Sequence, residues 1–459
     1  MKTAVKILVP SGAIGAGATR SPEPFERGVR ERPDVIAVDG GSTDSGPYYL
    51  GSGEPKPPRG ALRAELRQVM VARAELGVPL IVGSCGTSGS DNGVDVMRAL
   101  CEDIAKELGQ TVRVACIYSE QSGETLKAAL REGRISALKP ERALDDALID
   151  RCSRIVAAMG VEPIIHALQQ GVDIVLAGRA TDTALMAAVP IMQGMAPGAS
   201  WHAGKILECG AMCTTKPASG AVLATVDGTG FTIHALAEGG RATPRTVLAH
   251  MLYENSNPYV LVEPGGVLDV TEATYTSVDE RSVRVEGSTW TPSERYTVKL
   301  EGAAPVGYQG VILNTLRSPR YKGRFDEWLS SLETRVRAGI ASQLGLAPTD
   351  YHLQFRAIGR NATLGELETA SADPVEIGVM GIVTSPSQAR TKELLSMLNS
   401  PMLHFPLPDD EELPTHAFPF SPATMDRGVV YEFVLNHVMT VDDPLSPFRF
   451  SYATFGVAP

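Results

Sequence analysis

The chain has 459 residues, enough for roughly two or three domains. Apolar residues make up 43% of it and charged residues 21%, a globular balance that excludes wholesale disorder. The net charge of −11 lacks the basic excess of a nucleic-acid-binding protein, so we expect no nucleic-acid partner.

Short β-branched runs alternate with amphipathic segments in the N-terminal part of the chain. The runs predict strands at residues 5–9, 35–38, 80–82, 112–118, 155–159 and 174–176. The amphipathic segments predict helices at residues 23–30, 62–76, 93–108, 124–132, 144–152, 163–170 and 183–191. Such apolar strands, spaced for crossover helices, predict an α/β fold with a doubly wound, mainly parallel, Rossmann-like sheet. A barrel of alternating strands and helices is the alternative.

After about residue 255 the pattern changes to short strands, predicted at residues 260–270, 273–277, 282–286, 296–300 and 310–314. Helices are then predicted over residues 326–344 and 386–398, flanking strands at 352–358 and 375–383. This order is typical of an α+β domain. We therefore expect an α/β domain over residues 1–255 and a β-rich, then α+β domain over residues 256–459.

Six cysteines are too few for a disulfide framework in a chain of this length. We expect reduced thiols and a cytoplasmic protein. The apolar run at residues 7–18 resembles a signal peptide, but prolines and glycines interrupt it, so we interpret it as a strand and its loop. Prolines also interrupt the apolar stretch at residues 184–199, so we expect no membrane-spanning segment.

Loops rich in glycine, serine, threonine and aspartate follow several predicted strands, at residues 10–17, 39–46, 83–93, 119–123 and 178–183. In a parallel sheet such loops meet at one edge and lead into helix N-termini, which favour anions. We expect one anion-binding cleft there, with substrate contacts from Ser11, Gly12, Gly41, Ser42, Thr43, Ser84, Thr87, Ser88, Arg179 and Thr181. The glycine spacing matches no dinucleotide or P-loop motif, so a carboxylate or a CoA group is favoured over a nucleotide.

Acidic side chains in these loops have two interpretations each. Asp39 and Asp44 are spaced to hold a divalent ion such as Mg²⁺, or they form turns and helix caps. Glu120 and Asp182 are candidate general bases, or caps of the helices that follow them. Arg179 either clamps a substrate carboxylate or pairs locally with Asp182.

Residues 202–209 bring several titratable groups into one short segment. Lys205 and Glu208 are candidate groups for charge stabilisation and proton transfer, and Cys209 is a candidate nucleophile beside the cations His202 and Lys205. The alternative is that Cys209 is a buried, inert thiol. We interpret the other seven histidines as structural.

Several segments in order carry a family resemblance, at residues 173–185, 203–211, 236–240, 251–258 and 268–270. The chain resembles the acyclic terpene utilisation (AtuA-like) proteins over nearly its whole length. It departs from the family pattern at residues 212–220 and lacks an aromatic residue in its first loop, which favours a different substrate. The resemblance implies bacterial catabolism of branched or unsaturated acids, as free acids or CoA thioesters. It also implies a small accessory chain in place of the extra C-terminal domain of longer members.

Together these observations predict an enzyme that removes a proton from carbon next to a carbonyl group, a hydro-lyase or an isomerase. Its substrate would be a small carboxylic acid or acyl-CoA. One alternative is a non-catalytic subunit that binds such an acid or CoA ester, and another is a nucleotide-dependent transferase or ligase. The acidic charge and methionine-bearing helices are compatible with a homo-oligomer.

Overall fold

The computed structural model describes residues 2–16, 21–371, 373–410 and 413–456. The chain has a mixed α/β fold that divides into two compact units, residues 1–304 with 433–459, and residues 305–432. Residues 256–304 and 433–459, which we assigned to a second domain from the sequence, therefore belong to the first unit. The division falls within two long strands, β15 (Tyr296–Leu316) and β18 (Thr424–Val441).

The first unit is built on a ten-stranded mixed sheet. Five parallel strands form its centre, in the order β1 (Ala4–Val9), β2 (Val35–Asp39), β3 (Leu80–Gly83), β7 (Ile174–Ala177) and β4 (Val112–Tyr118). Antiparallel strands extend it beyond β1, namely β8 (Val222–Asp227), β9 (Gly230–Ala235), β13 (Ser282–Glu286) and β12 (Thr274–Ser277). On the other side β19 (Arg449–Phe455) pairs with β4. This sheet is open, so the barrel alternative is wrong.

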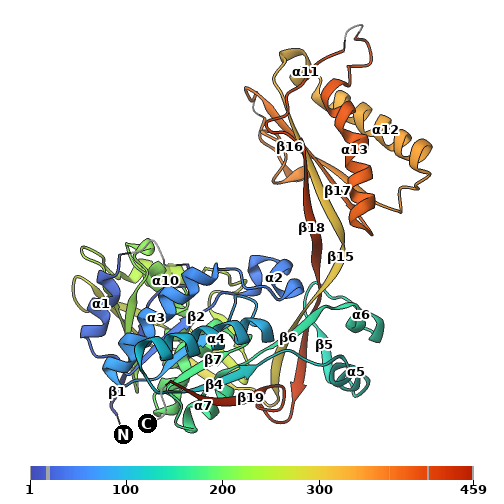
Figure 1. The fold of residues 1–459 in the computed structure, drawn as a ribbon. Helices are drawn as coiled ribbons and strands as arrows, with labels where there is room; N and C mark the ends of the chain where they lie inside the picture. The colour runs from blue at the N-terminus through green and yellow to red at the C-terminus, as the bar shows by residue number, and fades with distance from the viewer. Residues whose placement is uncertain (1, 17–20, 372, 411–412, 457–459) are drawn as a thin grey trace. The chain divides into compact units, whose positions relative to one another are not determined.

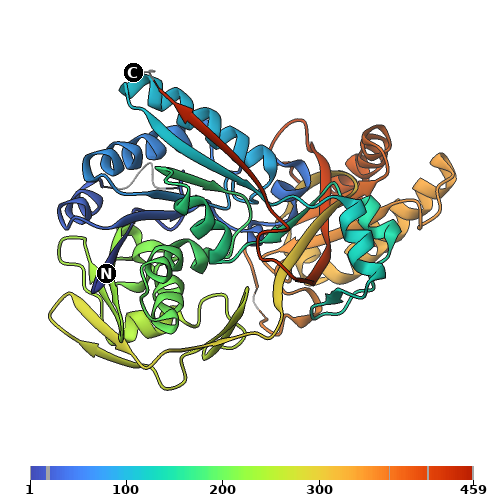
Figure 2. The same cartoon turned by 90° about the horizontal axis from the view of Figure 1, so that it is seen from below.

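Helices cover both faces of this sheet because its central strands are apolar on both sides. Leu8 and Ile36 pack with α1 (Glu23–Arg30), α3 (Arg59–Leu76) and α4 (Asp91–Leu108). Ile7 and Val175 face the opposite way and pack with α7 (Val161–Gln169), α8 (Asp182–Met192) and α9 (Pro197–Leu207). Figure 2 shows α3 and α4 in blue and cyan on one side of the strands and the green helices on the other. This layering places the carboxyl ends of the parallel strands at one edge.

The strand expected at residues 155–159 forms, as β6 (Arg154–Ala158), but outside this sheet. It pairs antiparallel with β15 through residues 299–303. A run of apolar residues predicts that a strand forms, but it does not predict which strand pairs with it. The sequence therefore located β6 but not its place in the fold. The remaining elements of the first unit are α2 (Pro47–Ser52), α5 (Gly123–Arg131), β5 (Ile135–Ala137), α6 (Asp146–Arg151), α10 (Pro244–His250), β10 (Val260–Glu263), β11 (Gly266–Asp269) and β14 (Thr289–Pro292).

The second unit is an antiparallel sheet with helices. Strands β16 (His352–Ile358), β17 (Ile377–Ser385), β15 and β18 are neighbours in that order. Figure 1 shows β15 and β18 side by side. Helices α12 (Phe325–Leu344) and α13 (Gln388–His404) bury Trp328, Leu332 and Leu398 against the sheet, and α11 (Pro319–Gly323) precedes them. The runs at 296–300 and 310–314, expected as two strands, form the single strand β15.

In the described part of the chain, no helix is both long and apolar enough to cross a lipid bilayer.

Candidate functional site

A cleft of about 570 Å³ lies at the carboxyl edge of the parallel strands in the first unit. Its polar lining comes from segments far apart in the sequence: Ser42, Thr43, Asp44, Arg142, Arg179, Asp182, Glu254, Lys299, Glu301 and Asn436. Five of these, Ser42, Thr43, Asp44, Arg179 and Asp182, are residues that the sequence analysis assigned to the site. The volume suits a small molecule.

The strand ends place these side chains. β2 ends at Asp39, and the following loop caps a short helical turn with Ser42, whose hydroxyl accepts a hydrogen bond from the Asp44 amide. β7 ends at Ala177, and Asp182 is the first residue of α8, where the helix dipole favours a carboxylate. Because β2 and β7 run parallel in one sheet, both loops reach the same edge.

Arg179 is buried and already paired. Its Nε donates to Glu301 Oε2 at 2.8 Å, and its Nη1 donates to the Ala180 carbonyl at 2.8 Å and to Asp182 Oδ1 at 3.4 Å. Burial favours the neutral form of Arg179, but Glu301 and Asp182 raise its pKa above the usual value. No described residue accepts a hydrogen bond from Nη2, which leaves this nitrogen for a ligand in the cleft.

Glu301 is the main counter-ion of Arg179. Its Oε1 accepts a hydrogen bond from Lys299 Nζ at 2.7 Å, so the carboxylate lies between two cations. Burial acts to raise the pKa of Glu301, but the charges of Arg179 and Lys299 prevail and lower it to about 2. Glu301 is therefore an anion at every physiological pH.

Asp182 differs from Glu301 in its environment. Burial raises its pKa, although the nearby cations Arg179 and Lys205 act to lower it, and the charge of Asp44 raises it further. About a quarter of its side chain, 23%, is still exposed toward the cleft. A carboxyl group with a raised pKa that reaches a cleft is suited to accept and return a proton.

Asp39 lies behind the cleft rather than in its lining. Its Oδ2 accepts a hydrogen bond from the Gly41 amide at 2.7 Å, while its buried Oδ1 has no partner among the described residues. Burial and the charge of Asp182 raise its pKa. Asp39 and Asp44 belong to no group of three metal-ligating side chains in the described part of the chain.

Glu254 faces Asp44 across the mouth of the cleft. Burial raises the pKa of Glu254, the Tyr253 hydroxyl acts to lower it, and the neighbouring Asp44 carboxyl group raises it further. Glu254 has a backbone φ of +57°, a conformation that non-glycine residues adopt at a cost. Asp44 and Glu254 thus place two neighbouring carboxyl groups in the lining of the cleft.

A second layer of charged groups is buried beneath. Lys205, on α9, donates to Glu208 and to the Tyr253 carbonyl at 3.1 Å. Thr183 donates to Glu263 Oε1 at 2.7 Å, and burial raises the pKa of Glu263 to about 7. Burial also raises the pKa of Glu208 in spite of Lys205. The charge of Asp182 raises the pKa of both Glu208 and Glu263, so this layer adjoins the cleft.

Cys209 is half-buried beside Glu208, and burial raises its thiol pKa well above the usual value. His202 supplies it with no positive charge, because burial lowers the pKa of His202 to about 3. The His202 ring instead contacts the hydroxyl groups of Ser288, at 2.7 Å, and Tyr275, at 3.2 Å. These surroundings favour the protonated thiol over a free thiolate nucleophile.

Glu120 lies away from the cleft. Its carboxylate accepts a hydrogen bond from the Asp91 amide at 2.9 Å, at the start of α4, and pairs with Arg154 at 3.4 Å. Glu120 thus caps the N-terminus of α4 and pairs with Arg154, which is a structural role.

The loop after β3 braces the cleft from behind. Ser84 accepts a hydrogen bond from Arg179 Nη1 at 3.3 Å, Thr87 donates to the Gly40 carbonyl at 3.1 Å, and Ser88 donates to the Tyr49 carbonyl at 3.3 Å. Thr87 also packs so closely on Gly41 that a Cβ there would lie 3.0 Å from it. The Thr181 hydroxyl, before α8, lies 3.2 Å from the Thr183 hydroxyl.

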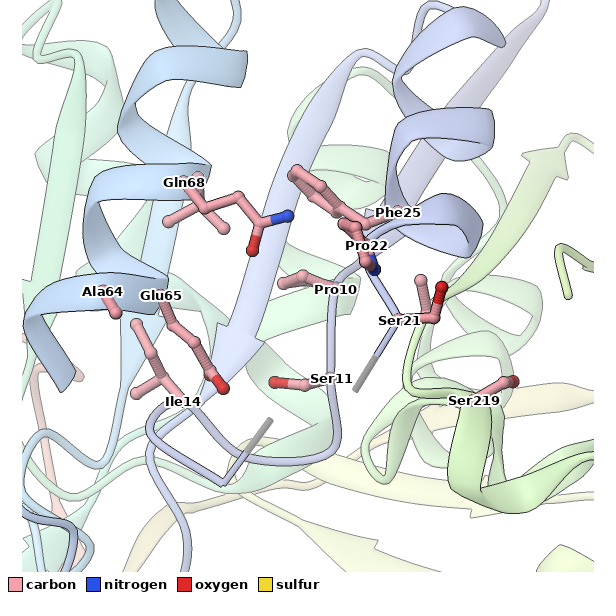
Figure 3. Close-up of a pocket in the computed structure, with 12 residues that line it drawn as sticks. Pro10, Ser11, Ile14, Ser21, Pro22, Phe25, Ala64, Glu65, Gln68 and Ser219 are labelled. Atoms are coloured by element: carbon pink, nitrogen blue, oxygen red, sulfur yellow. The ribbon is translucent and has the colours of Figure 1, made fainter. Parts of the chain in front are cut away.

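Ser11 lies in a separate, smaller pocket of about 170 Å³ that shares no lining residue with the cleft. Figure 3 shows Ser11 between Pro10 and the loop to Ile14, with Glu65 and Gln68 reaching in from α3. The Ser11 hydroxyl donates to the Ala13 carbonyl at 3.0 Å. Gly12 instead packs on the backbone of Cys209, where an added Cβ would lie 2.8 Å from the carbonyl oxygen.

Four charged residues in or beneath the cleft were not predicted from the sequence: Glu254, Glu263, Lys299 and Glu301. Glu254 lies within one of the segments that carry the family resemblance, which could have drawn attention to it. Lys299 and Glu301 alternate along β15 like ordinary surface charges, and only the fold brings them to Arg179.

A family model described as acyclic terpene utilisation family protein AtuA matches residues 59–406. Neither the curated proteins nor the solved structures contain a significant match to the chain.

Proposed function

The chain belongs to the acyclic terpene utilisation family, and from this premise we propose that it is an enzyme of carboxylic acid catabolism. It removes a proton from carbon next to a carbonyl group, as a hydro-lyase or an isomerase. The substrate is a small carboxylic acid or its CoA thioester.

One observation carries this proposal: Asp182 presents a carboxyl group of raised pKa to a cleft that also contains Arg179 and Lys299. A general base works best when its pKa approaches the operating pH. The two cations provide the attraction that an anionic substrate needs. We assign Asp182 as the base and Arg179 Nη2 with Lys299 Nζ as the carboxylate contacts.

The carboxyl pair of Asp44 and Glu254 completes the scheme. After Asp182 takes the proton, Glu254, whose raised pKa favours the protonated carboxyl group, donates its proton to a departing hydroxyl group, which leaves as water. In an isomerisation no water leaves, and Asp182 returns the proton that it has taken to another carbon atom of the substrate. Charge on the substrate carbonyl oxygen during either reaction is stabilised by the neighbouring cations.

Several further assignments belong to this proposal. We infer a Rossmann-like winding of the parallel strands, a cytoplasmic location and a homo-oligomeric assembly, with a small accessory chain as a candidate partner. The five parallel strands with helices on both faces support the first of these.

Exchange of hydrogen for deuterium tests the reaction without knowledge of the product. The purified protein is incubated in D₂O with hydroxy and unsaturated carboxylic acids, free and as CoA thioesters, and the proton next to the carbonyl is followed by NMR. Asp182→Asn should slow exchange by about a hundredfold or more, because it removes the base. Asp146→Asn is the control, since Asp146 is also the first residue of a helix, but its side chain is half-exposed and paired with Arg131.

A non-catalytic subunit that binds the acid or CoA ester is the second candidate, favoured by the commitment of Arg179 to internal partners. If the chain is such a subunit, an acid or CoA ester should raise its unfolding temperature, but the proton next to the carbonyl group should not exchange with deuterium. Exchange that survives in Asp182→Asn would contradict the assignment of the base.

A further inference from the structure

We propose that Glu208, Cys209 and His250 bind one transition-metal ion such as Zn²⁺ next to the cleft. Of the described residues, these three form a group whose potential ligand atoms all lie within 4.8 Å of one another. They come from the end of α9, the turn after it and the end of α10. The three donors are thus gathered by tertiary structure rather than by a sequence motif.

The strongest indication is the imidazole of His250. Its Nε2 atom is buried, lies 3.9 Å from Glu208 Oε1, and has no hydrogen-bond partner among the described residues. The residue as a whole is only 4% exposed. A buried, unpaired ring nitrogen is costly unless something else occupies its lone pair or accepts its proton.

The neighbouring backbone holds these side chains in place. Gly12 allows close packing on the carbonyl of Cys209. Gly210 has a φ of +60°, and a Cβ added there would lie 2.4 Å from the Gly220 carbonyl oxygen. The His250 ring stacks on Tyr253, with centroids 5.5 Å apart and an angle of 14° between the planes. Ligands on such a constrained framework lose little entropy when they bind an ion.

The surrounding charge favours a cation. Glu208 and Cys209 both feel the negative charge of Asp182, and Cys209 also feels that of Glu254. Lys205 opposes this, because its charge acts on Glu208, Cys209 and His250. It bonds to Glu208, however, and a carboxylate has lone pairs for both an ammonium group and a metal ion. An ion would therefore offset acidic groups that Lys205 leaves uncompensated.

The donor types select the metal. A thiolate, an imidazole and a carboxylate suit Zn²⁺ or Co²⁺, whereas Mg²⁺ prefers oxygen ligands alone. Three protein ligands leave a fourth position for water or substrate, as in catalytic zinc sites. Tetrahedral ligands would lie about 3 to 4 Å apart, so small side-chain rotations would close the present spacing. Binding breaks the Cys209 S–H bond, forms the sulfur–metal bond and releases the proton to solvent.

Cobalt substitution tests the proposal directly. The full-length protein is loaded with Co²⁺, passed through a desalting column and assayed for metal content and for the sulfur-to-cobalt charge-transfer absorption. We expect about one equivalent of Co²⁺ per chain. Cys209→Ser should abolish the charge-transfer band, and His250→Gln should weaken Co²⁺ binding by about tenfold or more.

Matched controls come from the same chain. Cys152 is half-buried like Cys209, and His416 has a buried, unpaired Nε2 like His250, but neither belongs to the cluster. Cys152→Ser and His416→Gln should keep the metal content and the band. A wild-type protein without the band, or controls that lose metal as the ligand variants do, would overturn the proposal.

A second readout covers variants that fold poorly. In the wild-type protein Zn²⁺ should slow alkylation of Cys209 by iodoacetamide, measured by peptide mass spectrometry, and leave the rate at Cys152 unchanged. Equal rates at Cys209 with and without Zn²⁺ would contradict the site. Neither cobalt binding nor alkylation of Cys209 requires the enzyme to convert a substrate. The metal site and the proposed reaction can therefore fail independently.

Discussion

Arg179 is the residue on which the charge balance of the cleft depends. It is buried and contacts Glu301, Asp182 and Ser84, three residues from different segments. A buried guanidinium needs such partners because its desolvation is costly. The same arrangement leaves only one edge of the group for a substrate, so Arg179 is better suited to a single charge-assisted contact than to a bidentate clamp.

Glu301→Gln should destabilise the first unit by about 3–5 kcal/mol at pH 7, because it leaves the charge of Arg179 partly unpaired. The pKa of Glu301 is lowered in the folded state, from 4.5 to about 2, so its contribution is present above pH 4.5 and is lost as the pH falls toward 2. The facing groups are Arg179 and Lys299. Urea unfolding at pH 7 and pH 3 should therefore show a smaller difference between wild type and variant at pH 3.

Glu132→Gln is the control for this experiment. Glu132 also accepts from an arginine, Arg134, at 2.7 Å, but the pair is exposed. Its loss should change the free energy of unfolding by less than about 1 kcal/mol. An equal effect of the two substitutions would contradict a special role for the buried pair.

Part of the cleft lining could be predicted residue by residue from the sequence. Ser42, Asp44, Arg179 and Asp182 follow strand ends, as the strand-end rule requires, and all four line one cleft in the structure. Lys299 and Glu301 were beyond reach because their site is created by pairing of β15 with β6. The choice of Glu120 or Asp182 as the base could not be made from the sequence, since both lie next to helix starts.

Between elements, the contact of α8 with α9 determines where Asp182 and Lys205 lie. Gly204 on α9 packs directly on α8, where an added Cβ would lie 2.5 Å from the Thr183 carbonyl oxygen. A backbone atom cannot move aside without shifting its helix. Close packing of the two helices is therefore a condition for the buried layer of charges.

Gly204→Ala should cost about 1–3 kcal/mol of stability, because it forces these helices apart. Gly60→Ala is the control: Gly60 lies in α3 with no atom within 4 Å of an added Cβ, and alanine there should be neutral or stabilising by up to about 1 kcal/mol. Thermal unfolding followed by circular dichroism compares the two. Equal melting temperatures for both variants would show that α8 and α9 tolerate the methyl group.

Individual elements were predictable where periodicity was strong. The helix at residues 23–30 and the strands at 112–118 and 352–358 have the predicted bounds in the structure. Strands β8 and β9 and helix α9 were missed, the last because its apolar face continues all round and shows no amphipathic pattern. Strand pairing, as for β6, depends on contacts that no local pattern contains.

For the whole molecule, two compact units imply two hydrophobic cores. The tryptophans report on them separately, since Trp201 stacks on Trp290 in the first unit with centroids 4.9 Å apart, and Trp328 is buried in the second. A chain with two cores need not unfold in a single step. The position of this division was not predictable, because it falls inside continuous strands rather than in a linker.

We expect the two cores to unfold at different urea concentrations. Trp328→Phe leaves fluorescence from the first unit only, and the double variant Trp201→Phe/Trp290→Phe leaves fluorescence from the second only. The fluorescence midpoints of the two variants should differ from each other. Circular dichroism, which reports on both units, is measured on each variant to detect any shift that the substitutions themselves cause. Coincident midpoints would indicate one cooperative unit.

The cleft also has a consequence for how the protein is made. Its lining begins at Ser42 and includes Asn436, in the C-terminal half of β18. A ribosome must therefore deliver nearly all of residues 1–436 before the cleft can form, and chains still being synthesised would expose its acidic groups to water.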